Sequence, residues 1–206
     1  MKKGEKTKNL ILAKSLQLIA ENGYSGTSVR NISSTVGLRE SAIYNHFKSK
    51  KELLAEIVKK YGQNSSGLNL LTDELIEQLN KPFKFLNLFS EELLKRWSEE
   101  EQILFLKLVL KENGNEINGE KISINSYIEE AGKIWEMIFT EMIKHKFIKK
   151  GDPKIYANEF IAPLFFIRLK YLTNEKEINL KNAFKRINEH VNFFWENVKR
   201  ERREYR

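Results

Sequence analysis

The chain has 206 residues, 41% of them hydrophobic and 11% aromatic, and a formal net charge of +8. This composition supplies a core and excludes an intrinsically disordered chain. The lack of cysteine excludes disulfides, thiolate metal sites and cysteine nucleophiles, and it fits a reducing compartment. The longest uncharged apolar run, residues 160–167, is far shorter than the ~20 residues of a membrane span. We therefore expect a cytoplasmic protein with no membrane partner.

Two amphipathic helices are predicted at the start of the chain. Apolar residues at positions i, i+4, i+7 and i+8 indicate a helix over residues 7–22, which Gly23 ends. A second helix over residues 28–36 has Ser28 as its N-cap, and Gly37 can adopt the left-handed conformation that ends it. The turn to the next helix is therefore short.

A third helix is predicted over residues 38–47. Its apolar residues form one face, and Ser41, Tyr44, Asn45 and Lys48 lie at i, i+3, i+4 and i+7 on the opposite face. All four can donate hydrogen bonds to phosphates or to base edges. This pair of short helices around one glycine is therefore typical of a helix-turn-helix whose second helix reads DNA.

A fourth helix completes this region. Ser49 and Glu52 form a capping box, S-x-x-E, that starts a helix running to about Tyr61. We expect residues 1–61 to form one compact DNA-binding domain, in which residues 50–61 link the recognition helix to the second domain.

The charge distribution agrees with this division. Residues 1–61 hold 12 Lys and Arg against 5 Asp and Glu, a net charge of +7, whereas residues 62–206 hold 24 against 23, a net charge of +1. A basic excess on one domain is the electrostatic footprint of a protein that binds the DNA backbone. Alternatively, the excess is a solvated lysine-rich tail, because four lysines within residues 2–8 supply a third of these cations.

These segments together carry a specific motif. It comprises Gly23-Tyr24, Thr27-Ser28-Val29, Ile32, Val36-Gly37, Ile43-Tyr44-Asn45-His46-Phe47 and Lys48-Ser49-Lys50-Lys51-Glu52-Leu53-Leu54. With this motif, residues 10–54 resemble the TetR (tetracycline-repressor-like) transcriptional regulators. The resemblance implies that residues 62–206 form an all-helical effector-binding and dimerisation domain. The DNA-binding residues we expect are Thr27, Ser28, Arg39, Glu40, Ser41, Ala42, Tyr44, Asn45, His46, Lys48 and Lys51.

Two residues at the start of the recognition helix depart from the family pattern. Arg39 stands where the family most often has serine, and Glu40 stands where lysine is common. An arginine can bind guanine bidentately, and a glutamate can accept a hydrogen bond from cytosine N4, so both can specify an operator sequence. Alternatively, Glu40 only complements the helix dipole.

Helices are predicted throughout the second part of the chain. Two of these helices cover residues 72–80 and 83–97. Ser98 and Glu101 form a second capping box, which starts a largely apolar helix. An amphipathic helix then covers about residues 123–146. No segment shows the alternating pattern of a strand. The fold class we expect is therefore all-α, with an N-terminal three-helix helix-turn-helix domain and a C-terminal helical bundle.

The last two predicted helices suggest a homodimer. The first of them starts with Asp152 as N-cap and Pro153 as its first residue, and it runs to Leu172 with a kink at Pro163. The second covers residues 180–198, where apolar side chains recur at spacings of 4, 3, 4, 3 and 4 residues. TetR-like proteins build a four-helix dimer interface from their two C-terminal helices, which this pair resembles. Alternatively, the series packs within its own subunit. The interface residues we expect are Phe160, Leu164, Leu180, Phe184, Ile187, Val191, Phe194 and Val198.

The second domain is also rich in aromatic residues, which can line an apolar effector pocket. Ordinary core packing explains most of them equally well. Arg168 follows a long apolar run, where it can meet an anionic ligand group, or else pair across the dimer or extend to solvent. We expect a small hydrophobic effector, with these candidate pocket residues: Trp97, Phe105, Trp135, Phe139, Phe165 and Arg168.

The chain lacks the signatures of an enzyme. His46, His145 and His190 form no cluster at metal-ligand spacing, and there is no Gly-rich phosphate loop and no G-x-S-x-G. We expect no catalytic residue, no metal and no cofactor. The favoured function is a homodimeric repressor that a hydrophobic molecule releases from a palindromic double-stranded DNA operator by shifting residues 50–61. Two alternatives remain open: a helical adaptor whose helix-turn-helix binds protein, and a small helical enzyme.

Overall fold

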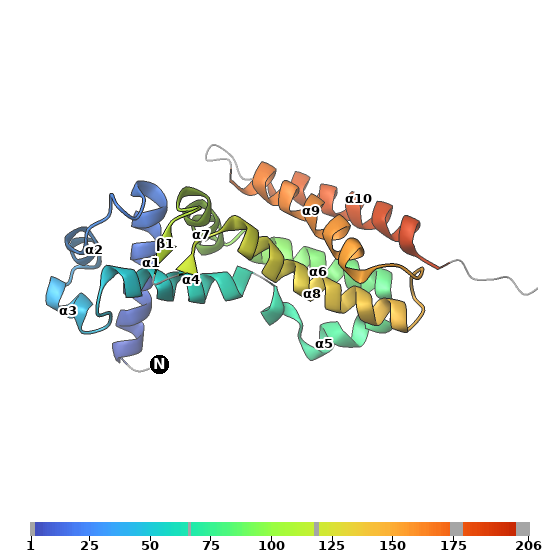
Figure 1. Ribbon diagram of the computed structural model, residues 1–206, viewed down its shortest axis with the longest axis horizontal. Helices are drawn as coiled ribbons and strands as arrows, with labels where there is room; N and C mark the ends of the chain where they lie inside the picture. The colour runs from blue at the N-terminus through green and yellow to red at the C-terminus, as the bar shows by residue number, and fades with distance from the viewer. Residues whose placement is uncertain (1–2, 66, 118–119, 174–178, 201–206) are drawn as a thin grey trace, which may run out of the picture. The chain divides into compact units, whose positions relative to one another are not determined.

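Over the residues that the structure describes, the chain is α-helical apart from one short β-hairpin (Figure 1). The computed structural model describes residues 3–65, 67–117, 120–173 and 179–200. Its helices are α1 (Lys3–Asn22), α2 (Val29–Val36), α3 (Glu40–Tyr44), α4 (Lys50–Ser65), η1 (Leu68–Leu70), α5 (Asp73–Ile76), η2 (Glu77–Asn80), α6 (Pro82–Trp97), α7 (Glu100–Lys111), α8 (Ile124–Lys144), α9 (Pro153–Leu172) and α10 (Leu180–Val198). Between α7 and α8, strands β1 (Glu116–Ile117) and β2 (Glu120–Lys121) pair antiparallel. The expected all-α class is confirmed.

Helix length and apolarity bear on whether the chain enters a membrane. Among the described helices, none combines the length and the apolar character that crossing a bilayer requires.

The chain divides into two compact units that differ from the expected domains. The first unit comprises Met1–Ser65 and Glu99–Tyr127, and the second comprises Ser66–Ser98 and Ile128–Arg206. Because α7 packs against α1 and α4, a segment far along the chain belongs to the N-terminal unit. The functional division into residues 1–61 and 62–206 stays a prediction, but it does not coincide with these units.

The core of the first unit consists of the apolar faces that the sequence predicted. Leu12, Leu16 and Ile19 of α1 are at most 3% exposed, and Ile43 and Phe47 are each 2% exposed. Full burial of such a side chain contributes about 1.5–3 kcal/mol relative to exposure. These side chains therefore hold α1, α3 and the turn after α3 in the core of the first unit.

Helix α7 adds an aromatic contact to this core. The ring of Phe105 lies 6.5 Å from that of Tyr61 and 6.1 Å from that of Tyr127, measured between centroids. Gln102 donates a hydrogen bond from Nε2 to the backbone oxygen of Tyr61, at 3.3 Å. Phe105 therefore belongs to the first unit and not with the other expected pocket residues, which all lie in the second unit.

Four helices meet at an aromatic cluster in the second unit. The rings of Phe89 (α6), Trp135 (α8), Phe160 (α9) and Phe194 (α10) form a chain with successive centroid distances of 4.8, 4.4 and 4.8 Å. Aromatic pairs of this kind contribute about 0.5–1.5 kcal/mol beyond their burial. The cluster therefore joins α6, α8, α9 and α10 into one bundle.

Two of the predicted helix starts can be compared with the structure: the N-cap at Asp152 is confirmed, and the capping box at Ser98 is not. Asp152 accepts a hydrogen bond from the backbone N–H of Lys154 at 2.8 Å, and Pro153 is the first residue of α9, as expected. The predicted capping box at Ser98 is wrong, because the N-cap of α7 is Glu99 and has no side-chain cap hydrogen bond. The hydroxyl of Ser98 instead donates to the backbone oxygen of Lys95, at 2.6 Å, closing the end of α6.

The apolar series on α10 packs within its own subunit. Helix α10 contacts α9 and α6, and the two C-terminal helices lie side by side in Figure 1. Six of the eight residues expected at a dimer interface are at most 6% exposed: Phe160, Leu164, Ile187, Val191, Phe194 and Val198. Their assignment to an interface is therefore corrected, because a side chain buried in its own subunit offers no surface to another. Phe184 is partly exposed, and Leu180 is 38% exposed.

Candidate nucleic-acid interface

Helix α2 is closed at both ends as the sequence predicted. Ser28 accepts a hydrogen bond at Oγ from the Asn31 N–H, and Asn31 accepts at Oδ1 from the Ser28 N–H, each at 3.0 Å. At the other end Gly37 has a φ of +74°, the left-handed conformation that a side chain disfavours. The Leu38 N–H then donates to the Ser33 carbonyl at 2.9 Å. This reversal fixes the direction in which α3 leaves α2.

Helix α3 is shorter than the sequence predicted. It spans Glu40–Tyr44, and the next residues form a turn in which the N–H groups of His46 and Phe47 both donate to the Ile43 carbonyl at 3.0 Å. Ile43 and Phe47 are buried and hold the segment on the core. Tyr44 between them is 50% exposed. The polar stripe therefore continues past the end of the helix, on a turn with fixed hydrogen bonds.

Most of the expected DNA-binding residues are accessible. The side chains of these eight are exposed: Ser28, Arg39, Glu40, Ser41, Tyr44, Asn45, Lys48 and Lys51. Ala42 and His46 are partly exposed, and the His46 ring lies 6.3 Å from the Phe47 ring between centroids. Arg39 caps α3 with its backbone alone, so its guanidinium makes no cap hydrogen bond.

Thr27 does not belong to this surface. It is 1% exposed, and its hydroxyl donates to the carbonyl oxygens of Gly23, at 2.9 Å, and Leu18, at 3.2 Å. The expectation that Thr27 contacts DNA is therefore corrected. It fastens the turn before α2 to the end of α1.

Lys50 has a structural role that the sequence did not predict. Its Nζ donates to the backbone oxygens of Tyr24 and Thr27, both at 2.8 Å, and lies 4.0 Å from the centre of the Tyr24 ring. Lys50 thus joins the first residue of α4 to the turn between α1 and α2. A pattern of side chains in the sequence cannot predict this contact, because the acceptors are backbone atoms.

Ser49 and Glu52 cap the start of α4, but their hydrogen bonds differ in part from those of the predicted capping box. Ser49 accepts a hydrogen bond at Oγ from the Glu52 N–H at 3.1 Å. The Glu52 carboxylate accepts from the N–H of Lys48, not from that of Ser49. The backbone of Lys48 is therefore held, while its side chain stays exposed.

The expected effector residues of the second unit are packed into its core. Trp97, Trp135, Phe139, Phe165 and Arg168 are at most 7% exposed. The Trp97 ring lies 5.4 Å from that of Phe165, and the Arg168 guanidinium lies 4.8 Å from the centre of the Trp97 ring. Arg168 is therefore a cation inside the aromatic bundle, and not a side chain that extends to solvent.

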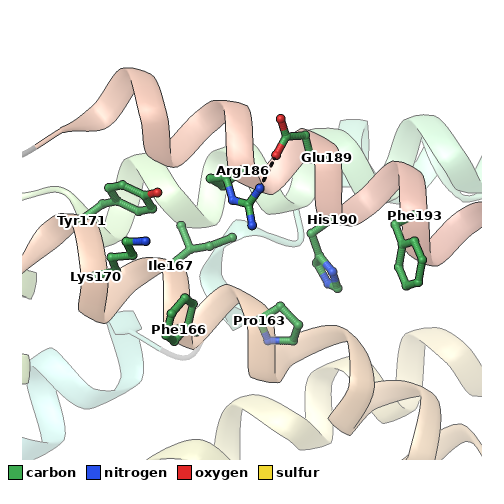
Figure 2. Close-up of a pocket in the computed structure, with 9 residues that line it drawn as sticks. All are labelled: Pro163, Phe166, Ile167, Lys170, Tyr171, Arg186, Glu189, His190 and Phe193. Carbon is green, nitrogen blue, oxygen red and sulfur yellow. Dashed lines mark hydrogen bonds and ion pairs between the residues drawn. The ribbon is translucent and has the colours of Figure 1, made fainter.

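An open groove lies between α9 and α10 (Figure 2). Its volume is about 590 Å³, and it is lined by Pro163, Phe166, Ile167, Lys170, Tyr171, Arg186, Glu189, His190 and Phe193. Phe166 is 62% exposed and Phe193 is 72% exposed. Arg186 and Glu189 form an ion pair of 2.7 Å at its edge. The groove thus combines accessible aromatic surface with charges of both signs.

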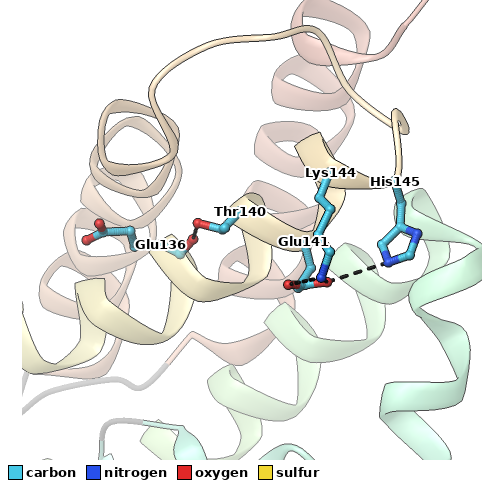
Figure 3. Close-up of polar contacts among 5 residues, drawn as sticks. All are labelled: Glu136, Thr140, Glu141, Lys144 and His145. Carbon is cyan, nitrogen blue, oxygen red and sulfur yellow. Dashed lines mark hydrogen bonds and ion pairs between the residues drawn. The ribbon is translucent and has the colours of Figure 1, made fainter.

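The two histidines of the second unit have structural partners. His145 lies 3.5 Å from Glu141, which also binds Lys144 at 3.1 Å, on the exposed end of α8 (Figure 3). The Nε2 of His190 hydrogen-bonds to the Phe160 carbonyl at 2.8 Å, and burial lowers the pKa of His190. Within the described ranges no three His, Cys, Asp or Glu side chains form a potential metal site.

Comparison with known proteins gives a family and several relatives. Residues 11–57 match the family model described as bacterial regulatory proteins, tetR family. The fatty acid metabolism regulator protein of Bacillus subtilis is 25% identical over 152 residues, 73% of this chain and 75% of that protein. The biofilm operon icaADBC HTH-type negative transcriptional regulator IcaR of Staphylococcus aureus is 35% identical over 52 residues, 25% of this chain and 28% of that protein.

Solved structures share the fold over almost the whole chain. The SmeT–triclosan complex has a TM-score of 0.70 at 19% identity and covers 95% of this chain and 93% of that one. SmeT is the repressor of the Stenotrophomonas maltophilia multidrug efflux pump SmeDEF. The similarity therefore extends through both units, beyond the segment that the family model matches.

Proposed function

Because this chain belongs to the TetR family of bacterial transcriptional regulators, we propose that it is a homodimeric repressor that a small hydrophobic molecule releases from a palindromic operator. The observation that carries the proposal is the exposed polar face of α3 and the turn after it, mounted on a buried apolar face in a region of net charge +7. Such a face can reach into the major groove while the basic excess binds the phosphates.

Arg39 and Glu40 are the residues we propose to specify the operator. Both are exposed at the first turn of α3, where a recognition helix contacts base edges. Tyr44 and Lys48 lie farther along the same face and suit phosphate or base contacts. Their substitution should therefore weaken binding generally, whereas substitution of Arg39 should change which sequence is bound.

The groove between α9 and α10 supports a dimer through a different face from that expected. A two-fold interface uses the same surface patch on both subunits, so exposed Phe166 and Phe193 would meet the corresponding surface of a second copy. Lys170, Arg186 and Glu189 line the groove and allow opposite charges to pair across the axis. Two recognition helices related by this axis would read half-sites about one helical turn, ~34 Å, apart.

The effector site we propose lies in the second unit. The aromatic side chains that join its helices are packed against one another, so an effector would have to separate them to reach their apolar rings and the buried Arg168 cation next to Trp97. The relatives' names support a hydrophobic ligand, since one is a fatty acid metabolism regulator and another structure holds triclosan. By linkage, DNA must weaken effector binding by the factor with which the effector weakens DNA binding, a coupling of typically 1–3 kcal/mol.

One experiment tests these parts separately. The full chain is mixed with a labelled duplex from upstream of its own gene, at low and moderate salt, and the retarded complex is then titrated with oleate and with triclosan. We expect a sequence-specific complex that one of these compounds dissociates. A complex that forms but survives both compounds would contradict the hydrophobic-effector part. Failure to prefer this duplex over an unrelated one would contradict the operator part and favour a protein-binding adaptor.

A further inference from the structure

The end of α1 is in contact with a lysine at the end of α7. The Nζ of Lys111 donates hydrogen bonds to the backbone oxygens of Ala20, at 3.1 Å, and Glu21, at 2.6 Å. Carbonyls in the last turn of a helix have no partner within that helix, and a cation there also complements the helix dipole. Lys111 therefore caps α1 from a position 90 residues later in the chain than Glu21.

Glu112 completes this contact. It is 5% exposed, and its Oε1 accepts a hydrogen bond from the backbone N–H of Tyr24 at 2.7 Å. Its other oxygen accepts from the side-chain amide of Asn115. If α1 continued, the Tyr24 N–H would bind the Ala20 carbonyl. Instead, Glu112 accepts the hydrogen bond of the Tyr24 N–H, and Lys111 donates one to the Ala20 carbonyl. Two consecutive side chains at the end of α7 therefore supply the hydrogen bonds that the next turn of α1 would have made.

The backbone at this point is shaped for the contact. Gly23 has a φ of +78°, and a Cβ there would lie 3.3 Å from Glu112 Oε1 and 3.6 Å from Lys111 Cδ. Burial together with the Glu112 charge raises the pKa of Tyr24, whose ring also lies under Lys50. The turn between α1 and α2 is therefore held from α4 by Lys50 and from the end of α7 by Lys111 and Glu112.

The contact bears on DNA reading because α2 begins directly after this turn. Ser28, the N-cap of α2, comes next to Thr27, whose backbone oxygen Lys50 holds. The turn therefore directly precedes α2, and the reversal at Gly37 fixes the direction in which α3 leaves α2. We propose that Lys111 and Glu112 form a clamp through which α7 positions the helix-turn-helix for its operator. They are positioning residues that need not touch DNA.

The test compares specific with non-specific DNA binding. The full chain and its variants are titrated with the operator duplex and with an unrelated duplex of equal length, and the Tm of each variant is measured. Glu112→Ala should lower operator affinity about tenfold, leave affinity for the unrelated duplex unchanged, and keep the protein folded at the assay temperature. Glu112→Gln, which retains an oxygen acceptor for Tyr24, should restore most of the operator affinity. The matched control is Glu116→Ala, which removes the same charge from an exposed site and should behave like the unaltered chain.

The outcomes separate positioning from folding. If Glu112→Ala lowers both affinities in equal proportion, the residue acts only on the folded fraction, and the clamp is overturned. Specific binding that stays unchanged in Glu112→Ala also overturns it. If that variant does not fold, Lys111→Met, which retains an apolar stem but no donor, carries the same two expectations. This inference rests on the proposed function. If the unaltered chain does not bind the operator specifically, the proposed function and the clamp are both overturned. If the unaltered chain binds specifically, the operator affinities of the variants test the clamp alone.

Discussion

Arg168 stacks on Trp97 inside the second unit, with its guanidinium 4.8 Å from the centre of the indole ring and both side chains fully buried. A planar guanidinium can stack in this way, whereas a lysine ammonium is a compact point charge. A desolvated cation–π contact is worth about 2 kcal/mol. We therefore expect Arg168→Lys to lower the free energy of unfolding by about 1–2 kcal/mol, as measured by urea denaturation.

The control for that measurement is Lys154→Ala. Lys154 is an exposed cation near the start of α9, and its removal should change the free energy of unfolding by no more than about 0.5 kcal/mol. If Arg168→Lys were as stable as the unaltered chain, stacking on Trp97 would contribute nothing, and the role given to this buried cation would be wrong.

Phe193 tests the dimer face. It is 72% exposed on α10, so Phe193→Asp should leave the subunit folded and yield a monomer, as measured by sedimentation equilibrium. Met137→Asp places the same charge at another exposed apolar site of the second unit, 50% exposed on α8, and should leave the dimer intact. Dimers that persist in Phe193→Asp would exclude this face as the interface.

Val191 distinguishes the revised face from the series that the sequence suggested. It is 0% exposed, so Val191→Ala should destabilise the subunit by about 1–3 kcal/mol through lost packing. The dissociation constant of the dimer should not change at temperatures where the variant stays folded. A selective loss of dimer with unaltered unfolding would restore Val191 to the interface.

Gly37 tests the turn of the helix-turn-helix. A Cβ at this position would meet nothing within 4 Å, so the cost of Gly37→Ala comes from its φ of +74° alone. That cost is about 1–2 kcal/mol, and we expect a corresponding loss in the free energy of thermal unfolding. Gly4→Ala is a matched control, because Gly4 also has open space but lies within α1 and has no positive φ, so alanine should be neutral or stabilising. Equal effects of the two substitutions would contradict the conformational explanation.

Local patterns allowed much of the fold to be predicted. The apolar stripe of α1, the Ser28 cap, the left-handed Gly37 and the Asp152-Pro153 start of α9 each depend on residues within a few positions of one another. The exposure of Ser41, Tyr44, Asn45 and Lys48 follows from the same periodicity, because Ile43 and Phe47 must be buried.

Features that depend on distant partners could not be predicted in this way. A 4-3-4 series on α10 shows that one face is buried, but its spacing is the same whether the partner is in the same subunit or in another. Thr27 is polar and follows a turn, so its burial becomes visible only with its acceptors, Leu18 and Gly23. Helix α7 packs against α1, and the sequence does not mark the hydrogen bonds of Lys111 to backbone carbonyls at this contact.

The recognition face itself offers the most direct test of the proposed function. Affinity for the upstream duplex is measured by fluorescence anisotropy over a range of salt. The proteins are the unaltered chain, Lys48→Ala, the double variant Tyr44→Ala with Lys48→Ala, and Lys59→Ala, which removes an exposed cation on α4. We predict that the double variant loses specific binding, and that Lys48→Ala alone lowers the slope of log affinity against log salt by about 1. We predict that Lys59→Ala keeps its preference for the operator. Full operator affinity in the double variant would contradict the assignment of α3 as the helix that reads DNA.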